Sequence, residues 1–215
     1  RVYSQDPDWN DKRVAGEVTF ADTEGWQQAL EAVVALKDAG CFQKGAEGAG
    51  FDVVTKALVS GNSLAAFIPG PSSMQLKTTA EDQDFEVRAL PSEGGAADDF
   101  IYASANYAYS INAASRNKEA AKTFLEWLAE PEQTKAFAEI DGALPVTGLE
   151  DFDFENSAYK NVEELILDKR YAPLPNSEWS NAAVYDELGT GVQGLLTGQQ
   201  TPAQVLEAMD AAWDQ

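Results

Sequence analysis

Three short motifs contain residue types that could carry chemistry. Gly45–Gly50 is glycine-rich like a phosphate-binding loop, Ser115–Lys118 has the Ser-x-x-Lys spacing of acyl-serine enzymes, and Asp151–Glu155 resembles half of a calcium loop. Each motif lacks its completing residues. No Lys-Ser/Thr pair follows the glycines, no Ser-Asp-Asn or Lys-Thr-Gly accompanies the serine, and Asn156 stands where a calcium loop needs Gly. We therefore interpret the first motif as a surface loop and the second as a helix cap, and we predict no calcium site.

The composition of the chain excludes several classes of activity. It contains no histidine, which removes Ser-His-Asp, Cys-His and His-zinc chemistry together. With 36 Asp and Glu against 15 Lys and Arg, the formal net charge is −21. Such a negative field repels nucleic acid and anionic membrane surfaces. Cys41 is the single cysteine, so the chain can form no internal disulfide.

The elements that would position a site are predicted from hydrophobic periodicity and capping residues. At 215 residues and 44% apolar, the chain is long and apolar enough for one large domain or two small ones. Apolar spacing together with Ser, Thr, Asn, Pro and Gly boundaries predicts helices over 23–40, 53–58, 117–128, 131–140, 159–168, 183–196 and 202–213. Buried or half-buried strands are predicted over 64–68 and 85–89, with 101–111 a strand or an extended crossover. Strands and helices interleave, which indicates the α/β class.

Four segments in a fixed order carry a family resemblance. They read GEVTFADTEGWQQALEAVVALKDAGCF, ALVSGNSLAAFIPGP, YAYSINAASRNKEAAKTFLEWLAEPEQTKAFAEIDGALPV and PNSEWSNAAVYDELGTGVQGLLTGQQTPAQVLEAM. The third is the most specific of the four. In this order they resemble the C-terminal part of bacterial extracellular solute-binding proteins of the maltose-binding-protein type, and the likeness covers nearly the whole chain.

The resemblance implies a periplasmic-binding-protein-like, type II, two-lobed α/β fold represented by a C-terminal fragment. Residues 1–100 would form part of the C-terminal lobe, 101–168 an inserted segment of the N-terminal lobe, and 169–215 the return to the C-terminal lobe with closing helices. Gly94-Gly95 and Pro173–Pro175 would lie near the crossings between lobes. A long N-terminal region of the same protein would be missing, and both sheets would be incomplete. The full-length precursor would carry a signal peptide and an N-terminal lipid that anchors it to the membrane, so the protein would be extracellular or periplasmic.

The function implied by the resemblance is the substrate-binding component of an ABC importer. It would bind a carbohydrate between its lobes and deliver it to a membrane permease, without catalysis and without a cofactor or metal. Sugars present hydroxyls at their rim and C–H groups on their faces, so their sites need aromatic platforms and planar polar groups. The candidates are Trp179 and Tyr185, where the family places stacking aromatics, and Tyr102, Asp99, Glu178 and Asn181. For the two aromatics, packing in the core is the alternative role; for Asp99 it is a solvated loop charge.

One departure from the family pattern concerns the position after a Gly-Pro turn. The family often has an aromatic platform there, whereas this chain has Gly70-Pro71-Ser72-Ser73. The platform is therefore absent or supplied elsewhere. Trp9 could supply it from a loop, but a packing role fits Trp9 better.

Two alternative functions stay open at this stage. The first is a binding protein for a non-sugar solute such as a polyamine, which an inward-facing cluster of three carboxylates would indicate. The second is a glycoside hydrolase, which needs two carboxylates about 5–10 Å apart across a cleft. Asp98 and Asp99 are adjacent in sequence and fit that requirement poorly.

Overall fold

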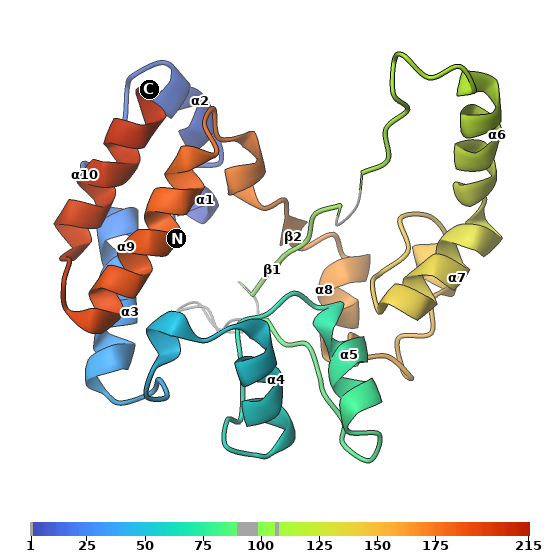
Figure 1. The fold of residues 1–215 in the computed structure, drawn as a ribbon, viewed down its shortest axis with the longest axis horizontal. Helices are drawn as coiled ribbons and strands as arrows, with labels where there is room; N and C mark the ends of the chain where they lie inside the picture. The colour runs from blue at the N-terminus through green and yellow to red at the C-terminus, as the bar shows by residue number, and fades with distance from the viewer. Residues whose placement is uncertain (1, 90–98, 106–107) are drawn as a thin grey trace. The chain divides into compact units, whose positions relative to one another are not determined.

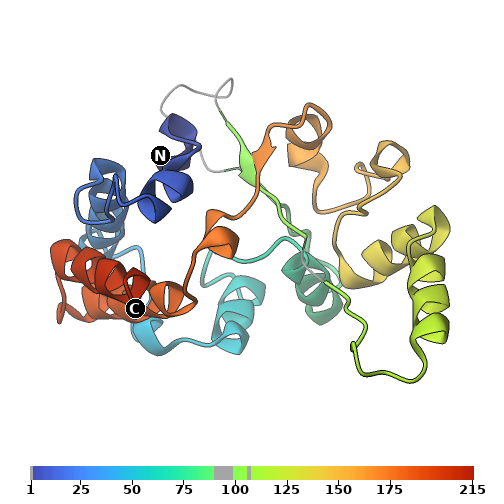
Figure 2. The ribbon, with the colours of Figure 1, turned by 90° about the horizontal axis from the view of Figure 1, so that it is seen from above.

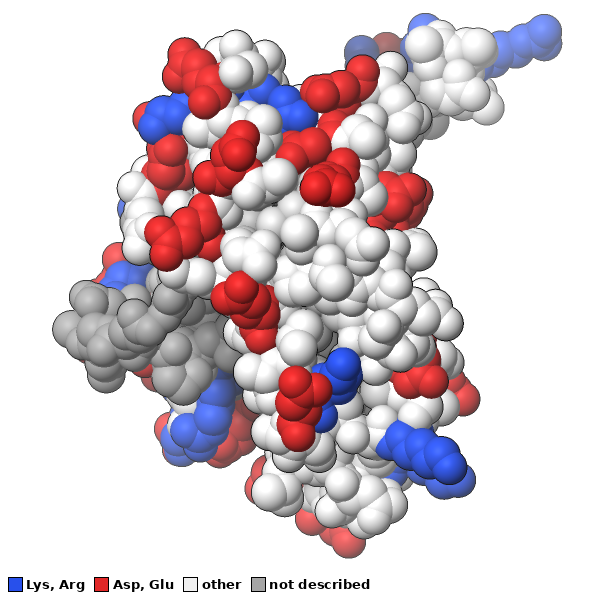
Figure 3. All heavy atoms as spheres, turned by 90° about the vertical axis from the view of Figure 1, so that its left-hand side faces the viewer, with Lys and Arg blue, Asp and Glu red and all other residues white. Residues whose placement is uncertain are grey.

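The computed structural model describes residues 2–89, 99–105 and 108–215. The chain divides into two compact units, which are described separately. Unit 1 comprises Arg1–Val53 and Pro175–Gln215, and unit 2 comprises Val54–Leu174. Among the described residues, no helix combines the length and the apolar character needed to cross a membrane. Figure 3 shows Asp and Glu side chains spread over the face that it presents, in keeping with the negative net charge.

Unit 1 is built from helices. Its two last helices lie side by side, next to the long helix from the first part of the chain (Figure 1). The predicted helices over 23–40, 183–196 and 202–213 are confirmed in this unit. Its helices are α1 (Val2–Gln5), α2 (Trp9–Val14), α3 (Glu24–Asp38), α9 (Ala183–Thr197) and α10 (Pro202–Trp213).

Local capping explains where these helices begin and end. Thr201 accepts a hydrogen bond from the backbone N–H of Gln204, whose side chain in turn accepts one from the backbone N–H of Thr201. This capping box satisfies two amide groups at the start of α10, and Pro202 occupies a first-turn position that needs no donor. Gly198 follows α9 with φ +74°, the left-handed conformation that glycine adopts without steric cost.

The core of unit 1 combines a cluster of aromatic rings with aliphatic side chains. Phe20 is fully buried and lies within 6 Å of the ring centroids of Trp9, Trp26 and Trp213. It is held in place from α10, because the Asp210 carboxylate accepts hydrogen bonds from the backbone N–H groups of Phe20 (2.8 Å) and Ala21 (2.9 Å). The other buried apolar residues are Val2, Leu30, Val184, Leu195, Val205, Leu206, Met209 and Ala212.

Unit 2 contains shorter elements and one small sheet. Ile101 of β1 stands opposite Tyr171 of β2 in a parallel pair (Figure 2). Its helices are the larger part of α4 (Phe51–Val59), then α5 (Ser72–Thr79), α6 (Lys118–Leu128), α7 (Pro131–Asp141) and α8 (Glu163–Leu167); its strands are β1 (Ile101–Tyr102) and β2 (Tyr171–Ala172). A small core gathers Phe154, Tyr159, Val162, Leu165 and Ile166.

Three of the four helices predicted in this unit are confirmed, and the fourth is divided into two shorter elements. α4, α6 and α7 confirm the helices predicted over 53–58, 117–128 and 131–140, and Gly142 ends α7 with φ +76°. The helix predicted over 159–168 is split, because a 3₁₀ turn over Lys160–Val162 precedes α8.

Two strand predictions are wrong for this chain as it folds here. Residues 64–68 and 85–89 form no strand. Leu64 is 99% exposed, so the first of these segments is not buried either. In the second, Val87 donates one backbone hydrogen bond to the carbonyl of Ala158, and Val87 and Ala89 pack on the core of unit 2. Apolar alternation selects an extended backbone, but a strand forms only where a neighbouring strand is present to share its hydrogen bonds.

The division into units does not coincide with the predicted lobe boundaries. The chain passes between units at Val53–Val54 and at Leu174–Pro175, whereas the predicted boundaries lie at 100–101 and 168–169. Pro173–Pro175, predicted to lie near a crossing, includes the second passage. Gly94-Gly95 lies outside the described residues. The assignment of segments to lobes stays a prediction.

Candidate functional site

Trp179 lies in unit 1, just after the 3₁₀ turn Pro175–Glu178. Its ring is half-buried and contacts the aromatic core edge-on, with centroid distances of 5.5 Å to Phe20 and 6.0 Å to Trp26. The ring centroid of Tyr185, in the first turn of α9, is 6.5 Å from the ring centroid of Trp179. Trp179 therefore packs on the core and keeps part of its surface accessible, and its contact with a ligand stays a prediction.

A chain of hydrogen bonds fixes the orientation of Trp179. Its indole Nε1–H donates to the hydroxyl of Tyr3 (3.2 Å), and that hydroxyl donates to Oδ1 of Asn10 (2.9 Å). The amide of Asn10, which is buried, donates to the carbonyl of Pro175 (3.1 Å) and to the carboxylate of Glu178 (3.4 Å). The two predicted residues Trp179 and Glu178 are thus tied through α1 and α2 to the same scaffold.

Tyr185 and Asn181 differ in what their polar groups are free to do. Tyr185 projects from the first turn of α9 and is 57% exposed. Asn181 uses both ends of its amide inside the unit. Its Nδ2 donates to the carbonyl of Ala212 (2.9 Å) and its Oδ1 accepts from the backbone N–H of Ala183 (2.9 Å). Tyr185 is thus the more accessible of the two, and Asn181 fastens the start of α9 to the end of α10.

Tyr102 and Asp99 lie in unit 2, at the start of the small sheet. Tyr102 is the second residue of β1, and its ring is 5.3 Å from that of Phe100. Partial burial raises the pKa of the Tyr102 phenol above its ordinary value, so it is a neutral hydrogen-bonding group at neutral pH. The backbone carbonyl of Asp99 accepts a hydrogen bond from Arg170 (2.6 Å). The six predicted site residues therefore fall into two groups, four in unit 1 and two in unit 2.

Unit 2 also contains a surface hollow of about 580 Å³. It includes Ser73, from the Gly70-Pro71-Ser72-Ser73 segment, and three aromatic side chains, those of Phe85, Phe152 and Tyr159. The Tyr159 hydroxyl donates to the carbonyl of Gly142 (2.8 Å), and burial, with a smaller effect from Asp141, raises the pKa of Tyr159 to about 12. Charged lining residues are Lys77, Lys160, Asp84, Glu86, Glu139, Asp153 and Glu155.

Several of the charged residues around this hollow have polar partners. Lys160 forms an ion pair with Glu155, and Glu86 accepts a hydrogen bond from Arg88 (2.6 Å). That bond is the main reason why the pKa of Glu86 lies below its ordinary value. Asp153 accepts hydrogen bonds from the backbone and side-chain amides of Asn156, so the half calcium loop closes as a local turn. Across the described residues, no three His, Cys, Asp or Glu side chains are grouped to hold a metal ion.

Sequence reasoning missed the residues that hold the site of unit 1 together. Tyr3 and Asn10 were not singled out, and their role depends on contacts with residues more than 160 positions away. Asn10 was predicted to lie in a loop, where the sequence shows no periodic spacing of apolar residues. Nothing in its local sequence therefore distinguishes it from a surface residue. Trp9 is 1% exposed, which confirms its packing role. The Ser115–Lys118 motif spans the start of α6, with Asn117 at the N-cap position. Ser115 accepts a hydrogen bond from the backbone N–H of Asn117 (3.1 Å), and no side-chain capping bond to the helix is formed by Asn117.

Comparison with known families decides to which group the chain belongs. The sequence profile of a family described as bacterial extracellular solute-binding protein matches residues 5–148, about two thirds of the chain. The chain belongs to this family. No curated protein sequence matches it closely enough to count as a relative.

Two solved structures of this kind resemble the chain in fold. One is a binding protein named MsmE from Bacillus subtilis subsp. subtilis strain 168 in an open conformation, with a TM-score of 0.72 and 17% identity over 95% of this chain and 50% of that one. The other is a chitin oligosaccharide binding protein, with a TM-score of 0.69 and 23% identity over 94% of this chain and 51% of that one. These likenesses confirm the predicted solute-binding-protein fold. The family and both structures are those of binding proteins, and this chain spans about half the length of each structure.

Proposed function

We propose that this family member is part of the substrate-binding component of an ABC importer and that its ligand is a carbohydrate. Family membership through residues 5–148 is the observation that carries the proposal. A chitin oligosaccharide binding protein among the structures of the same fold supports the ligand class. The ligand would be bound in the cleft between the two lobes of the complete fold and handed to a membrane permease.

The aromatic pair of unit 1 supplies chemistry suited to a sugar. The half-buried Trp179 is held rigidly by its bond to Tyr3, and Tyr185 is exposed beside it, so ring faces are presented without much loss of side-chain freedom on binding. The exposed carboxylate of Glu178 adds a planar acceptor for paired hydroxyls. We propose that these three residues contact the sugar, with Tyr102 and Asp99 contributing from unit 2 and Asn181 positioning the start of α9.

Delivery would depend on closure of the lobes around the ligand. A ligand that binds the closed form more tightly shifts the population toward it, and the permease then recognises that form. The proposal includes a longer polypeptide that supplies the remaining parts of both lobes. It also includes a lipid anchor at the N-terminus of the precursor, which would hold the protein near its permease outside the cytoplasmic membrane.

Binding can be tested by calorimetric titration of this chain, and of the complete protein encoded with it, against mono- and oligosaccharides. We expect saturable binding of at least one sugar by the complete protein. Tyr185→Ala should weaken it by about tenfold, since stacked aromatic contacts contribute about 0.5–1.5 kcal/mol beyond burial. Tyr109→Ala is the matched control, because Tyr109 has nearly the same exposure as Tyr185 (55% against 57%) but is not one of the proposed contact residues. No binding of any sugar would contradict the proposed ligand class.

A polyamine is the second candidate ligand, and the hollow of unit 2 favours it. Five carboxylates and two lysines line this hollow, which gives it a net negative charge. A linear cation could pair with Asp84 and Glu139, two of those carboxylates. Spermidine therefore belongs in the same titration. Binding of spermidine together with no binding of any sugar would mean that the ligand is a polyamine and not a carbohydrate. Charge-reversal at Glu139, by Glu139→Lys, should then abolish the response.

A further inference from the structure

The side-chain amide of Asn10 is shared between three other parts of unit 1. Asn10 lies on α2 and is 7% exposed. Its Oδ1 accepts from the hydroxyl of Tyr3 (2.9 Å), and its Nδ2 donates to the carbonyl of Pro175 (3.1 Å) and to the carboxylate of Glu178 (3.4 Å). Because an amide oxygen only accepts and an amide nitrogen only donates, these partners allow one orientation of the amide. With the bond from the indole of Trp179 to Tyr3 (3.2 Å), all donors point the same way, so each bond polarises the next.

One end of this hydrogen-bond chain lies at the passage between the two units. Pro175 is the first residue of unit 1 after the passage, and Leu174 is the last residue of unit 2. The backbone N–H of Leu174 donates to the hydroxyl of Ser104 (2.7 Å), which belongs to unit 2 as well. The proline ring fixes φ, and the residue before a proline stays extended, so the torsion ψ of Pro175 is the main one left to vary. This torsion orients the carbonyl that Asn10 holds.

We infer that Asn10 is a positioning residue that couples the proposed sugar contacts to this passage. A ligand hydroxyl that donates to Glu178 competes with Asn10 for the carboxylate, and the 3.4 Å bond is the longer of the two that Asn10 donates. Its release leaves the amide with Pro175 and Tyr3, so contact with the ligand alters the hold on the Pro175 carbonyl. The inference rests on the proposed sugar contacts of Glu178 and Trp179, and it adds how these contacts act on the passage.

A second buried amide of unit 1 shows what a purely fastening role looks like. Asn181 bonds only backbone groups, the carbonyl of Ala212 and the N–H of Ala183. Asn10 instead holds an exposed carboxylate, that of Glu178, which forms no ion pair with any residue that the structure describes. The charge of Glu178 is therefore held by a neutral amide, which a ligand donor can replace.

The coupling is tested first without any sugar, by NMR spectroscopy of isotope-labelled protein. The indole N–H of Trp179 and the carbonyl carbon of Pro175 report the two ends of the hydrogen-bond chain. Tyr3→Phe removes one hydroxyl, and we expect both signals to shift, since Asn10 loses the donor that holds its Oδ1. In an Asn10→Ala background, the same change should shift the signal of Trp179 only.

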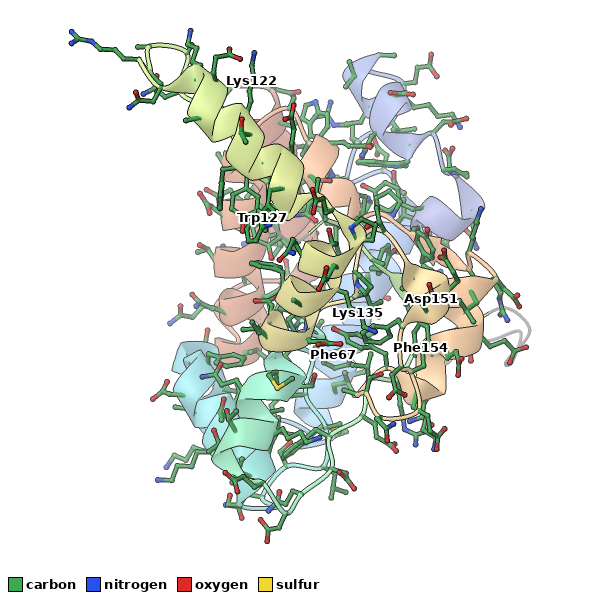
Figure 4. The ribbon with its side chains drawn as sticks, turned by 90° about the vertical axis from the view of Figure 1, so that its right-hand side faces the viewer. Phe67, Lys122, Trp127, Lys135, Asp151 and Phe154 are labelled. Carbon is green, nitrogen blue, oxygen red and sulfur yellow. The ribbon has the colours of Figure 1, made fainter. Side chains whose placement is uncertain are left out.

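The controls separate this coupling from general effects on the fold. The hydroxyl of Thr23 accepts from the indole of Trp9 (3.0 Å), another residue of α2, so Thr23→Val removes a comparable bond outside the chain through Asn10 and should not move the Pro175 signal. Trp127 is an internal reference in each spectrum, because its ring is 47% exposed on α6 of unit 2 (Figure 4). Asn10→Asp keeps the size of the side chain without the donor, and it replaces Asn10→Ala if that variant does not fold.

The second test measures sugar binding by the complete protein in calorimetric titrations. Tyr3→Phe and Asn10→Ala should each weaken binding by about three- to tenfold, the effect of losing about one hydrogen bond. The double variant should bind no more weakly than Asn10→Ala alone, because both changes interrupt the same chain of bonds. Thr201→Ala removes the cap of α10 and lowers the stability of the same unit, but it should leave the affinity unchanged.

Several outcomes would overturn the inference. These are a Pro175 signal that ignores Tyr3→Phe, a shift of that signal that is equal with and without Asn10, and affinity losses that add in the double variant. Sugar binding that neither Tyr3→Phe nor Asn10→Ala weakens would contradict the inference and leave the proposed ligand intact. Coupled NMR signals in a protein that binds no sugar would contradict only the proposed ligand.

Discussion

Two glycines on the same helix allow a substitution with opposite expected outcomes. Gly189 and Gly191 both lie within α9. A Cβ added at Gly189 would meet no heavy atom within 4 Å, whereas one added at Gly191 would lie 2.8 Å from Cγ2 and 3.1 Å from Cβ of Val205, and nearer still to Cγ1. Val205 belongs to α10 and is fully buried, so the overlap falls in the contact between the two helices.

The expected magnitudes follow from propensity and packing. Alanine is favoured over glycine inside a helix by about 0.8–1 kcal/mol, so Gly189→Ala should raise the free energy of unfolding by up to that amount. Gly191→Ala gains the same propensity, but overpacking costs about 1–3 kcal/mol. Val205 is β-branched and has one strongly preferred rotamer in a helix, so the helices must separate and the upper part of that range applies. We expect a net loss of about 2 kcal/mol, and about 3 kcal/mol between the two variants.

Urea unfolding followed by tryptophan fluorescence measures this difference. Four of the five tryptophans, at positions 9, 26, 179 and 213, belong to unit 1, so the signal reports mainly on the unit that contains both glycines. The midpoint should rise for Gly189→Ala and fall for Gly191→Ala at an unchanged slope. Equal shifts of the same sign in both variants would refute the close packing of α9 on α10 at Val205.

The remaining predictions concern an ion pair, a buried phenol and a helix cap. Asp210→Ala should lower the free energy of unfolding by about 3 kcal/mol in urea titrations, because it frees two backbone amides and leaves the buried Arg13 with Asp214 alone. Asp214→Ala should cost under about 1 kcal/mol, since that side chain is 67% exposed; equal losses would contradict the argument. Tyr159 has a pKa of about 12 in the folded protein, above its unfolded value near 10. Its contribution to the free energy of unfolding is therefore full below pH 10 and is lost as the pH rises toward 12. Tyr159→Phe should remove this part of the loss of stability at alkaline pH, and also the last step in a titration of tyrosinate absorbance. Thr201→Ala should cost about 1 kcal/mol by thermal unfolding, and a value near zero would show that the capping box at α10 contributes little.

Helices were predictable from the sequence because their signals are local. Thr201, Pro202, Pro131 and the glycines at 142 and 198 set helix boundaries through groups within one turn of the chain. The chain order of four helix-and-turn segments also supported the family, which the match over 5–148 confirms. The absence of histidine and the negative net charge excluded whole classes of chemistry without any structure.

The tertiary structure decided the strands and the surroundings of the site. Leu64–Ile68 has the composition of a strand, but its exposure depends on whether another strand lies beside it, which no local pattern encodes. The grouping of Trp179 with Tyr3 and Asn10 joins the two ends of the chain through hydrogen bonds, and only folding brings those ends together. Sequence fixes which residues prefer to be helical or buried, while long-range contacts determine which of those preferences are satisfied, because packing and strand pairing require partners that lie far away along the chain.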